Sequence, residues 1–268
     1  ADTVLWACPN DYNDILTVKS ADLIKDDPSY GVSRIVYYEN ERRKTVLIDA
    51  IQSGNLDIVK YLVKKGASPH IQEMYGRNAY HEAASTGNEK MISLILAAGG
   101  NPLSRDTQGV TPFSIILQGQ DEKLMKAVLG TNSKLLDSDS NTPIHIALEN
   151  DASSNTLALL MDMNFPVNIR NKNGITPLSI AVSKKLKDQT RVLLENGADP
   201  FITDNEKECP LSIVLKMEDD TIRDSILDEI VKLAGSKTDY QGEGILHYAA
   251  RSADVKTIQK LLEKGLDR

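Results

Sequence analysis

The sequence predicts an all-α solenoid of about eight stacked helix-turn-helix repeats joined by extended turns. A Thr-Pro-Leu opening, either intact or with substitutions, recurs near residues 3, 45, 78, 111, 142, 176, 209 and 244. The spacings between neighbouring openings are therefore 42, 33, 33, 31, 34, 33 and 35 residues. A single unit of this size cannot bury its apolar face alone, so the copies are expected to stack on one another.

The clearest copy occupies residues 176–200. Thr176 can cap a helix with its hydroxyl, and Pro177 follows at the first helical position, where its missing N–H costs nothing. A second helix buries apolar residues such as Leu194 and ends at Gly197, as a helix often does at a glycine. The same opening occurs in two other copies as Thr111-Pro112 and Thr142-Pro143.

The period of about 33 residues and the signature T-P-L-H-x-A are those of the ankyrin repeat. Residues 142–147 read T-P-I-H-I-A, so the chain resembles the ankyrin-repeat family, and the repeated openings extend the resemblance over nearly its whole length. The resemblance implies one domain, a single array over residues 1–268. It also implies that one recurring histidine orders the turns by hydrogen bonding between neighbouring repeats, a structural position occupied by His81, His145 and His247.

The first repeat starts near Thr3 and carries Trp6 at the signature's histidine position. Trp6 either covers the end of the stack or anchors a partner. An insertion of nine residues relative to the usual period falls within residues 25–44, which contain Tyr30 and Tyr38. Insertions in repeat arrays map to loops that often enlarge the binding face. We therefore expect either a tyrosine-rich contact loop or a solvated connection.

The later repeats depart from the pattern in three places. The fourth repeat lacks the usual ending at residues 130–132, so its second helix is expected to end early. In the seventh repeat, Asp220 or Thr221 is expected to cap the second helix. The eighth repeat stops at Arg268, where the next turn should begin. Either this repeat is the terminal cap or the native chain continues.

Composition excludes several classes of protein. The net charge of −7 and the pI of about 5.2 disfavour nucleic acid as a partner. No apolar run approaches the length of a membrane span, so no membrane insertion is expected. Cys8 and Cys209 lie in distant repeats and are expected to be free thiols, which favours a reducing compartment such as the cytoplasm. We expect a monomer.

Catalytic chemistry finds no support in the sequence. Metal-binding spacings such as C-x-x-C and H-E-x-x-H do not occur, and no glycine-rich phosphate loop is present. His70 stands alone in a turn and is expected to be solvated. The sequence therefore predicts a protein that is not an enzyme and has no cofactor.

The resemblance implies binding of another protein along a concave face made of turn tips and first helices. Met74, Tyr75 and Arg77 are the strongest candidates, because tyrosine and arginine carry much binding energy and methionine adapts to irregular partners. The full set of candidate partner-binding residues is Met74, Tyr75, Arg77, Gln108, Lys172, Asn173, Lys184, Met217 and Tyr240. The alternative is a regulatory or anchoring domain of a longer polypeptide, such as a channel or a modular enzyme.

Overall fold

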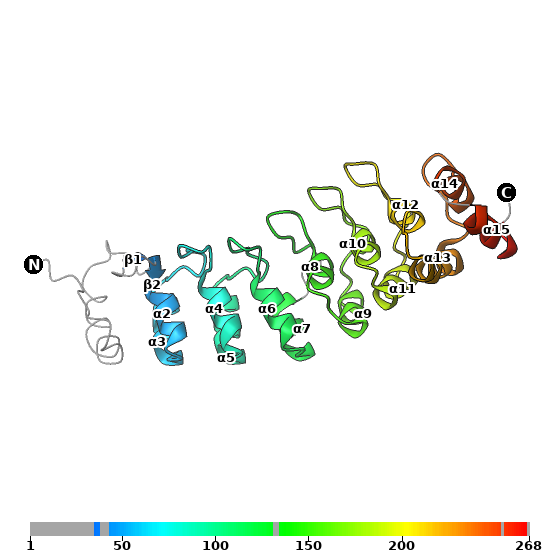
Figure 1. The fold of residues 1–268 in the computed structure, drawn as a ribbon. Coiled ribbons are helices and arrows are strands. Elements are labelled where there is room, and N and C mark those ends of the chain that lie inside the picture. The colour runs from blue at the N-terminus through cyan, green and yellow to red at the C-terminus, as the bar shows by residue number, and fades with distance from the viewer. Residues whose placement is uncertain (1–34, 38–42, 131–133, 253–254, 267–268) are drawn as a thin grey trace, which may run out of the picture. The chain divides into compact units, whose positions relative to one another are not determined.

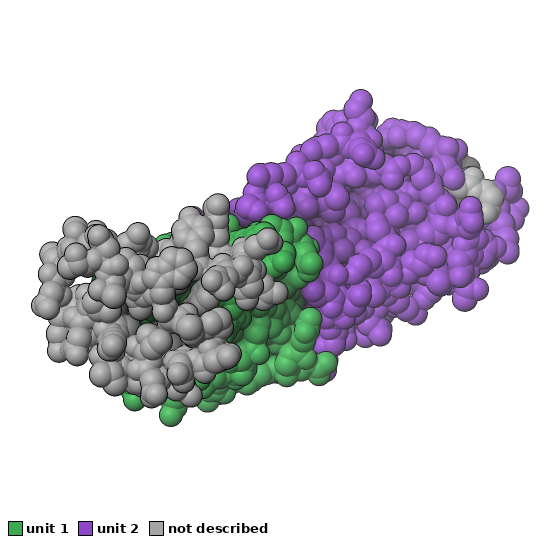
Figure 2. All heavy atoms as spheres, turned by 60° about the vertical axis from the view of Figure 1, so that its left-hand side comes forward, with its two compact units in different colours: residues 1–130 green, residues 131–268 purple. Residues whose placement is uncertain are grey.

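The computed structural model describes residues 35–37, 43–130, 134–252 and 255–266 (Figure 1). The first predicted repeat, with Trp6 and Cys8, lies outside these residues, as does most of the insertion at residues 25–44. The chain divides into two compact units, residues 1–130 and 131–268 (Figure 2). Each is described separately below.

Unit 1 contains three helix pairs among the described residues. They are α2 (Val46–Gln52) with α3 (Leu56–Lys64), α4 (Ala79–Thr86) with α5 (Glu89–Ala97), and α6 (Pro112–Gln118) with α7 (Glu122–Leu129). The first helices α2, α4 and α6 pack in sequence, and the second helices α3, α5 and α7 form the other layer. The core between them is aliphatic, apart from Tyr80 and Phe113, whose side chains are fully buried. The early end expected for the fourth repeat's second helix agrees with α7 stopping at Leu129.

Unit 2 contains four helix pairs among the described residues. They are α8 (Pro143–Glu149) with α9 (Ser154–Asp162), α10 (Pro177–Ser183) with α11 (Lys187–Glu195), α12 (Pro210–Leu215) with α13 (Asp220–Ala234), and α14 (Ile245–Ser252) with α15 (Val255–Glu263). Again the first helices pack on first helices, and α9 and α13 both pack on α11. Among the described residues, no helix is both long and apolar enough to cross a membrane.

The short first helices begin where their capping residues place them. Thr111, Thr142 and Thr176 each have extended backbone angles and accept a hydrogen bond from a backbone N–H of the first turn. Each is followed by a proline at the first helical position, where no N–H is needed. Cys209 replaces the threonine in its repeat, and its buried Sγ accepts from Ser212 N–H at 3.4 Å. The cap therefore tolerates sulfur in place of oxygen.

Two expectations from the sequence need correction. The insertion is not only a loop, because β1 (Ile35–Tyr37) pairs antiparallel with β2 (Arg43–Thr45), with Val36 opposite Lys44. The cap of α13 is neither Asp220 nor Thr221 but Asp219, whose carboxylate accepts from Ile222 N–H at 3.0 Å. Three consecutive residues at that point can all cap a helix, so the sequence places the helix start only to within two residues.

Buried histidines join neighbouring repeats in both units. His81 Nε2 lies 3.1 Å from the Val110 carbonyl oxygen, and His145 Nε2 lies 3.1 Å from that of Ile175. His247 occupies the same repeat position and its Nδ1 accepts from Gly244 N–H, but its side chain is exposed. Each buried ring thus connects the start of one first helix to the turn that precedes the next.

The turn tips of adjacent repeats are also hydrogen-bonded through their backbones. In unit 1, Thr107 N–H donates to the Tyr75 carbonyl at 3.0 Å. In unit 2, Lys172 N–H donates to the Asp139 carbonyl at 2.9 Å, and Asn205 N–H donates to the Asn173 carbonyl at 3.1 Å. These bonds hold the tips as a row rather than as separate mobile loops.

Candidate functional site

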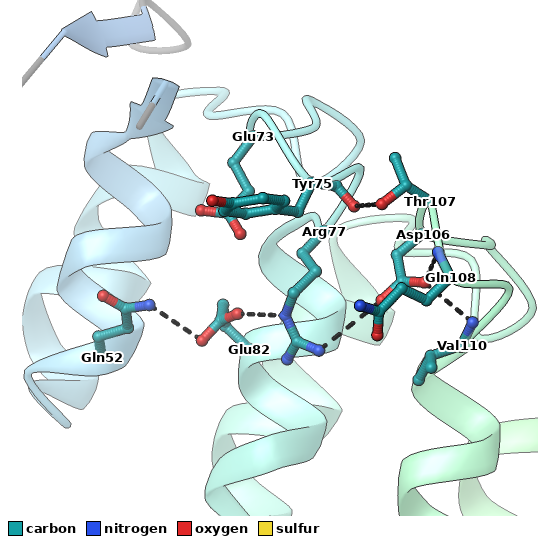
Figure 3. A pocket seen from close by; sticks show the side chains of 9 residues that line it. All are labelled: Gln52, Glu73, Tyr75, Arg77, Glu82, Asp106, Thr107, Gln108 and Val110. Carbon is teal, nitrogen blue, oxygen red and sulfur yellow. Dashed lines mark hydrogen bonds and ion pairs between the residues drawn. The ribbon is translucent and has the colours of Figure 1, made fainter. Parts of the chain in front are cut away.

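A hollow of about 420 Å³ lies in unit 1 between the turn tips and the first helices (Figure 3). Its walls come from α2, from the turn before α4, from α4 itself and from the turn before α6. The lining residues are Gln52, Glu73, Tyr75, Arg77, Glu82, Asp106, Thr107, Gln108 and Val110. Three of the candidates from the sequence, Tyr75, Arg77 and Gln108, are therefore brought together at one place.

Arg77 is the centre of a side-chain network across this hollow (Figure 3). Its Nε donates to Glu82 Oε1 at 2.8 Å, and its Nη2 donates to Ser85 Oγ at 2.8 Å. Its Nη1 lies 4.0 Å from Asp106 Oδ2 in the next turn. Gln52 on α2 donates to the second oxygen of Glu82 at 3.0 Å. The network therefore connects α2, α4 and the turn before α6.

The charges of the hollow are mutually stabilised. Burial opposes ionisation of Glu82, but the hydrogen bonds from Gln52 and Arg77 outweigh it and lower the pKa of this carboxyl. Asp106 Oδ1 accepts from the backbone N–H groups of Gln108 and Val110, which closes the turn beneath the network. The lining carries three carboxylates and one guanidinium, so the hollow is acidic.

The network positions two exposed apolar side chains at the tip. Met74 and Tyr75 are each 49% exposed, although both side chains are large and hydrophobic. Their turn is closed by Glu73 N–H donating to the Arg77 carbonyl at 2.8 Å and by the bond from Thr107. Thr107 Oγ1 also donates to the Tyr75 carbonyl, at 2.9 Å. These hydrogen bonds fix the backbone of the turn that carries Met74 and Tyr75.

Gly76 sets how closely the two tips approach. Its φ is +77°, and a Cβ added there would come 2.9 Å from Thr107 N. We predict that Gly76→Ala costs about 1–3 kcal/mol of unfolding free energy, from backbone strain and the forced separation of the tips. Gly87→Ala is the matched control, since Gly87 has a φ of +64° with no atom within 4 Å of a Cβ. Urea unfolding measures both, and equal losses would contradict the close approach.

The remaining candidates lie in unit 2. Lys172 and Asn173 are exposed on one tip, with Lys172 Nζ 3.9 Å from Asp139 Oδ1. Tyr240 is 91% exposed on another tip. Met217 is half-buried after α12. The ammonium of Lys184 donates to the Glu149 carbonyl and to Asp151 Oδ1, both at 2.7 Å, so this lysine caps the end of α8. Binding by these residues stays a prediction.

Sequence reasoning missed Gln52, Glu73, Glu82 and Asp106 as parts of the site. Asp106 and Glu73 occupy the position that starts each turn, so the repeat period marked them as structural. Glu82 follows the recurring His81 directly, and nothing in the pattern distinguishes it from a solvated residue on a first helix. Among the described residues, no group of three or more His, Cys, Asp and Glu side chains is placed to hold a metal ion.

The family model described as "Ankyrin repeats (3 copies)" matches residues 6–106 and 113–204. The chain belongs to the ankyrin-repeat family. The expected all-α ankyrin-repeat fold is confirmed by this match and by the stacked helix pairs. The ankyrin repeat also accounts for the recurring Thr-Pro openings and the shared histidine position.

Two curated relatives match about half of this ankyrin-repeat chain. The B-cell lymphoma 3 protein homolog of Mus musculus is 28% identical over 139 residues, which are 49% of this chain and 31% of the relative. The B-cell lymphoma 3 protein of Homo sapiens is 29% identical over 136 residues, which are 49% of this chain and 30% of the relative. The match thus spans less than a third of either relative's length.

One solved structure shows the same fold. The crystal structure of the ankyrin repeat domain of Bcl-3, described as a unique member of the IkappaB protein family, aligns with a TM-score of 0.62. The alignment covers 82% of this chain and 98% of that domain, at 21% sequence identity. At this identity the likeness supports the ankyrin architecture and says nothing about a particular ligand.

Proposed function

We propose that this ankyrin-repeat protein is a non-catalytic scaffold that binds another protein through the turn tips and concave face of unit 1. The observation that carries the proposal is the pair Met74 and Tyr75, two large apolar side chains that are each 49% exposed beside the hollow. Exposed apolar groups on a rigid turn are typical of contact sites, and tyrosine is enriched among the residues that dominate binding energy.

The fixed geometry of the turn supports this proposal. The bonds from Thr107 and the network around Arg77 hold the tip before any partner arrives. A preordered surface loses little conformational entropy on association, so more of the contact energy contributes to affinity. In this view Arg77 is a positioning residue, while Met74, Tyr75 and the exposed Gln108 make the contacts.

The acidic lining of the hollow and the ankyrin-repeat family both favour a protein as the partner. Three carboxylates surround one guanidinium whose N–H groups already bind Glu82 and Ser85, which disfavours a nucleic-acid phosphate. Ankyrin membership and the likeness to B-cell lymphoma 3 proteins support a protein partner. We propose that the chain acts as a monomer and that residues 1–268 form a single array.

A second candidate function is a regulatory or anchoring domain within a longer polypeptide. The match covers only 31% and 30% of the two relatives, so ankyrin arrays similar to this one occur as parts of longer proteins. Sequencing the full transcript in the source organism tests this candidate. A catalytic or channel region joined to residues 1–268 would favour the regulatory or anchoring domain. A transcript without such a region would favour the scaffold.

The binding face is tested by affinity capture from native lysate, read by mass spectrometry. Tyr75→Ala should reduce capture of the partner at least tenfold with little change in stability, because the side chain contributes to binding and not to the core. Tyr240→Ala is the comparison variant, a candidate tip tyrosine in unit 2, and capture that it retains while Tyr75→Ala loses it would locate the contact in unit 1. Loss with Tyr240→Ala alone, or retention with both variants, would place the binding face elsewhere.

A further inference from the structure

The outer helices of the last two repeats are joined by a ladder of ion pairs. Three carboxylates recur every four residues along α13, and three lysines recur every four residues along α15 and at the residue that follows it. The rungs of this Asp–Lys ladder are Asp220–Lys256 at 3.5 Å, Asp224–Lys260, and Asp228–Lys264 at 2.7 Å. Because four residues make about one helical turn, all three rungs lie on one face of each helix.

A buried arginine on α13 contacts two carboxylates of the ladder. Arg223 is 6% exposed, and its Nη2 lies 2.8 Å from Asp220 Oδ1 while its Nε lies 3.6 Å from Asp224 Oδ1. This guanidinium thus forms ion pairs with two of the three carboxylates on α13 itself. The third rung, Asp228–Lys264, forms at the far end of the helices.

Apolar packing of α15 is thinner than in the preceding repeats. Neighbouring outer helices within each unit pack on one another, as α11 does on α13, whereas α15 packs mainly on α14 and makes few contacts with α13. Leu261 is the one large apolar side chain that α15 fully buries, while Val255 and Leu262 on the same helix are 70% and 51% exposed. The ion pairs therefore supply a larger share of the attachment here than between other outer helices.

The rungs are accessible to solvent and hence to salt. Both members of the first and third rungs are 40–65% exposed. The Debye length falls from about 14 Å at 50 mM salt to about 4 Å at 500 mM, so exposed pairs weaken across this range. Weakening three exposed pairs together changes a docking equilibrium about tenfold.

We propose that the Asp–Lys ladder is a salt-sensitive latch that controls whether the α14–α15 hairpin stays docked on α12–α13. At low ionic strength the latch closes and holds the α14–α15 hairpin against α12 and α13. At high ionic strength the hairpin opens and uncovers the face of α12 on which α14 packs. The latch lies in unit 2 and is independent of the Tyr75 face proposed above.

Hydrogen exchange read by mass spectrometry on the whole chain tests the latch. Peptides covering α15 should exchange about tenfold faster at 500 mM than at 50 mM sodium chloride. Peptides covering α11 should keep their protection and serve as the internal reference. Equal exchange of α15 at the two salt concentrations, or an equal acceleration in α11, would overturn the proposal.

Exchanging the charges of the third rung tests whether the Asp–Lys pairs cause the salt effect. Lys264→Asp should accelerate exchange in α15 at 50 mM salt and reduce the salt effect, and Asp228→Lys should do the same. The double variant, Lys264→Asp with Asp228→Lys, should recover most of the protection, because the opposite charges face each other again. Lys126→Asp, which removes an exposed lysine from the last turn of α7 in unit 1, is the control and should leave exchange in α15 unchanged. Failure of the double variant to recover would show that the lysine acts without its partner.

Discussion

Lowering the pH from 7 to 5 should cost the folded chain about 2 kcal/mol of unfolding free energy through His145 alone. Burial lowers the pKa of this histidine to about 4, against an ordinary value near 6.5 in the unfolded chain. Between pH 4 and pH 6.5, His145 is therefore mostly protonated in the unfolded chain and mostly neutral in the folded chain. The stabilisation is complete above pH 6.5 and is lost progressively as the pH falls towards 4.

The hydrogen bonds of His145 explain why the folded ring stays neutral. Its Nδ1 accepts from Thr142 N–H at 3.1 Å, so Nε2 carries the proton and donates to the Ile175 carbonyl at 3.1 Å. Protonation of Nδ1 would replace this acceptor by a donor and place a charge in the core. Burial also lowers the pKa of His81, so unit 1 should respond in the same direction.

Urea unfolding followed by circular dichroism at pH 7 and pH 5 measures this effect. His145→Gln retains an acceptor for the Thr142 N–H but does not titrate, so its stability should change less over this interval than that of the wild type. His247→Gln, at the same repeat position on an exposed side chain, is the control. An unchanged pH dependence in His145→Gln would refute the assignment.

Truncating Leu194 to alanine should lower the unfolding free energy by about 2–5 kcal/mol, as a core truncation that leaves a cavity. The Leu194 side chain is 4% exposed on α11. Leu262 stands at the same place in its own repeat, 18 residues after the repeat begins, but it is 51% exposed on α15. Leu262→Ala should cost less than about 1 kcal/mol.

Comparing Leu194→Ala with Leu262→Ala separates the effect of side-chain burial on stability from the effect of repeat position. Both variants remove the same atoms at the same point of the repeat pattern, and only the packing around them differs. Chemical denaturation of the two variants gives the comparison. Losses of similar size would mean that repeat position decides the effect, and the assignment of Leu194 to a tightly packed core would then be wrong.

Local chemistry explains why much of the fold was predictable. Thr176 and Pro177 encode a helix start within two residues, and the same signal recurs with a period that only stacked repeats satisfy. The β1–β2 hairpin was not predictable in this way, because its pairing of Val36 with Lys44 falls within the insertion that interrupts the repeat pattern. Periodicity identifies such a position as irregular without indicating what forms there.

The candidate site was predictable in position but not in its interactions. The pattern places Tyr75 on an exposed tip, where the structure has it. The pattern also marked Arg77 as a candidate contact residue, whereas its side chain is 25% exposed and bonded to Glu82. Long side chains such as those of Arg77 and Lys184 can reach several nearby acceptors. Which acceptor they bind depends on the residues of the neighbouring repeats as well as on their own repeat.

The hydrogen bonds that link neighbouring repeats also shape how the chain folds as it is made. Among the described residues, side-chain bonds such as His81 to Val110 and Lys237 to Ala198 span 29 and 39 residues. Such separations are short relative to the length of the chain, and low contact order favours fast folding. During synthesis, the bonding partners of each repeat emerge from the ribosome with the next repeat, so the stack gains its contacts in chain order as further repeats are added.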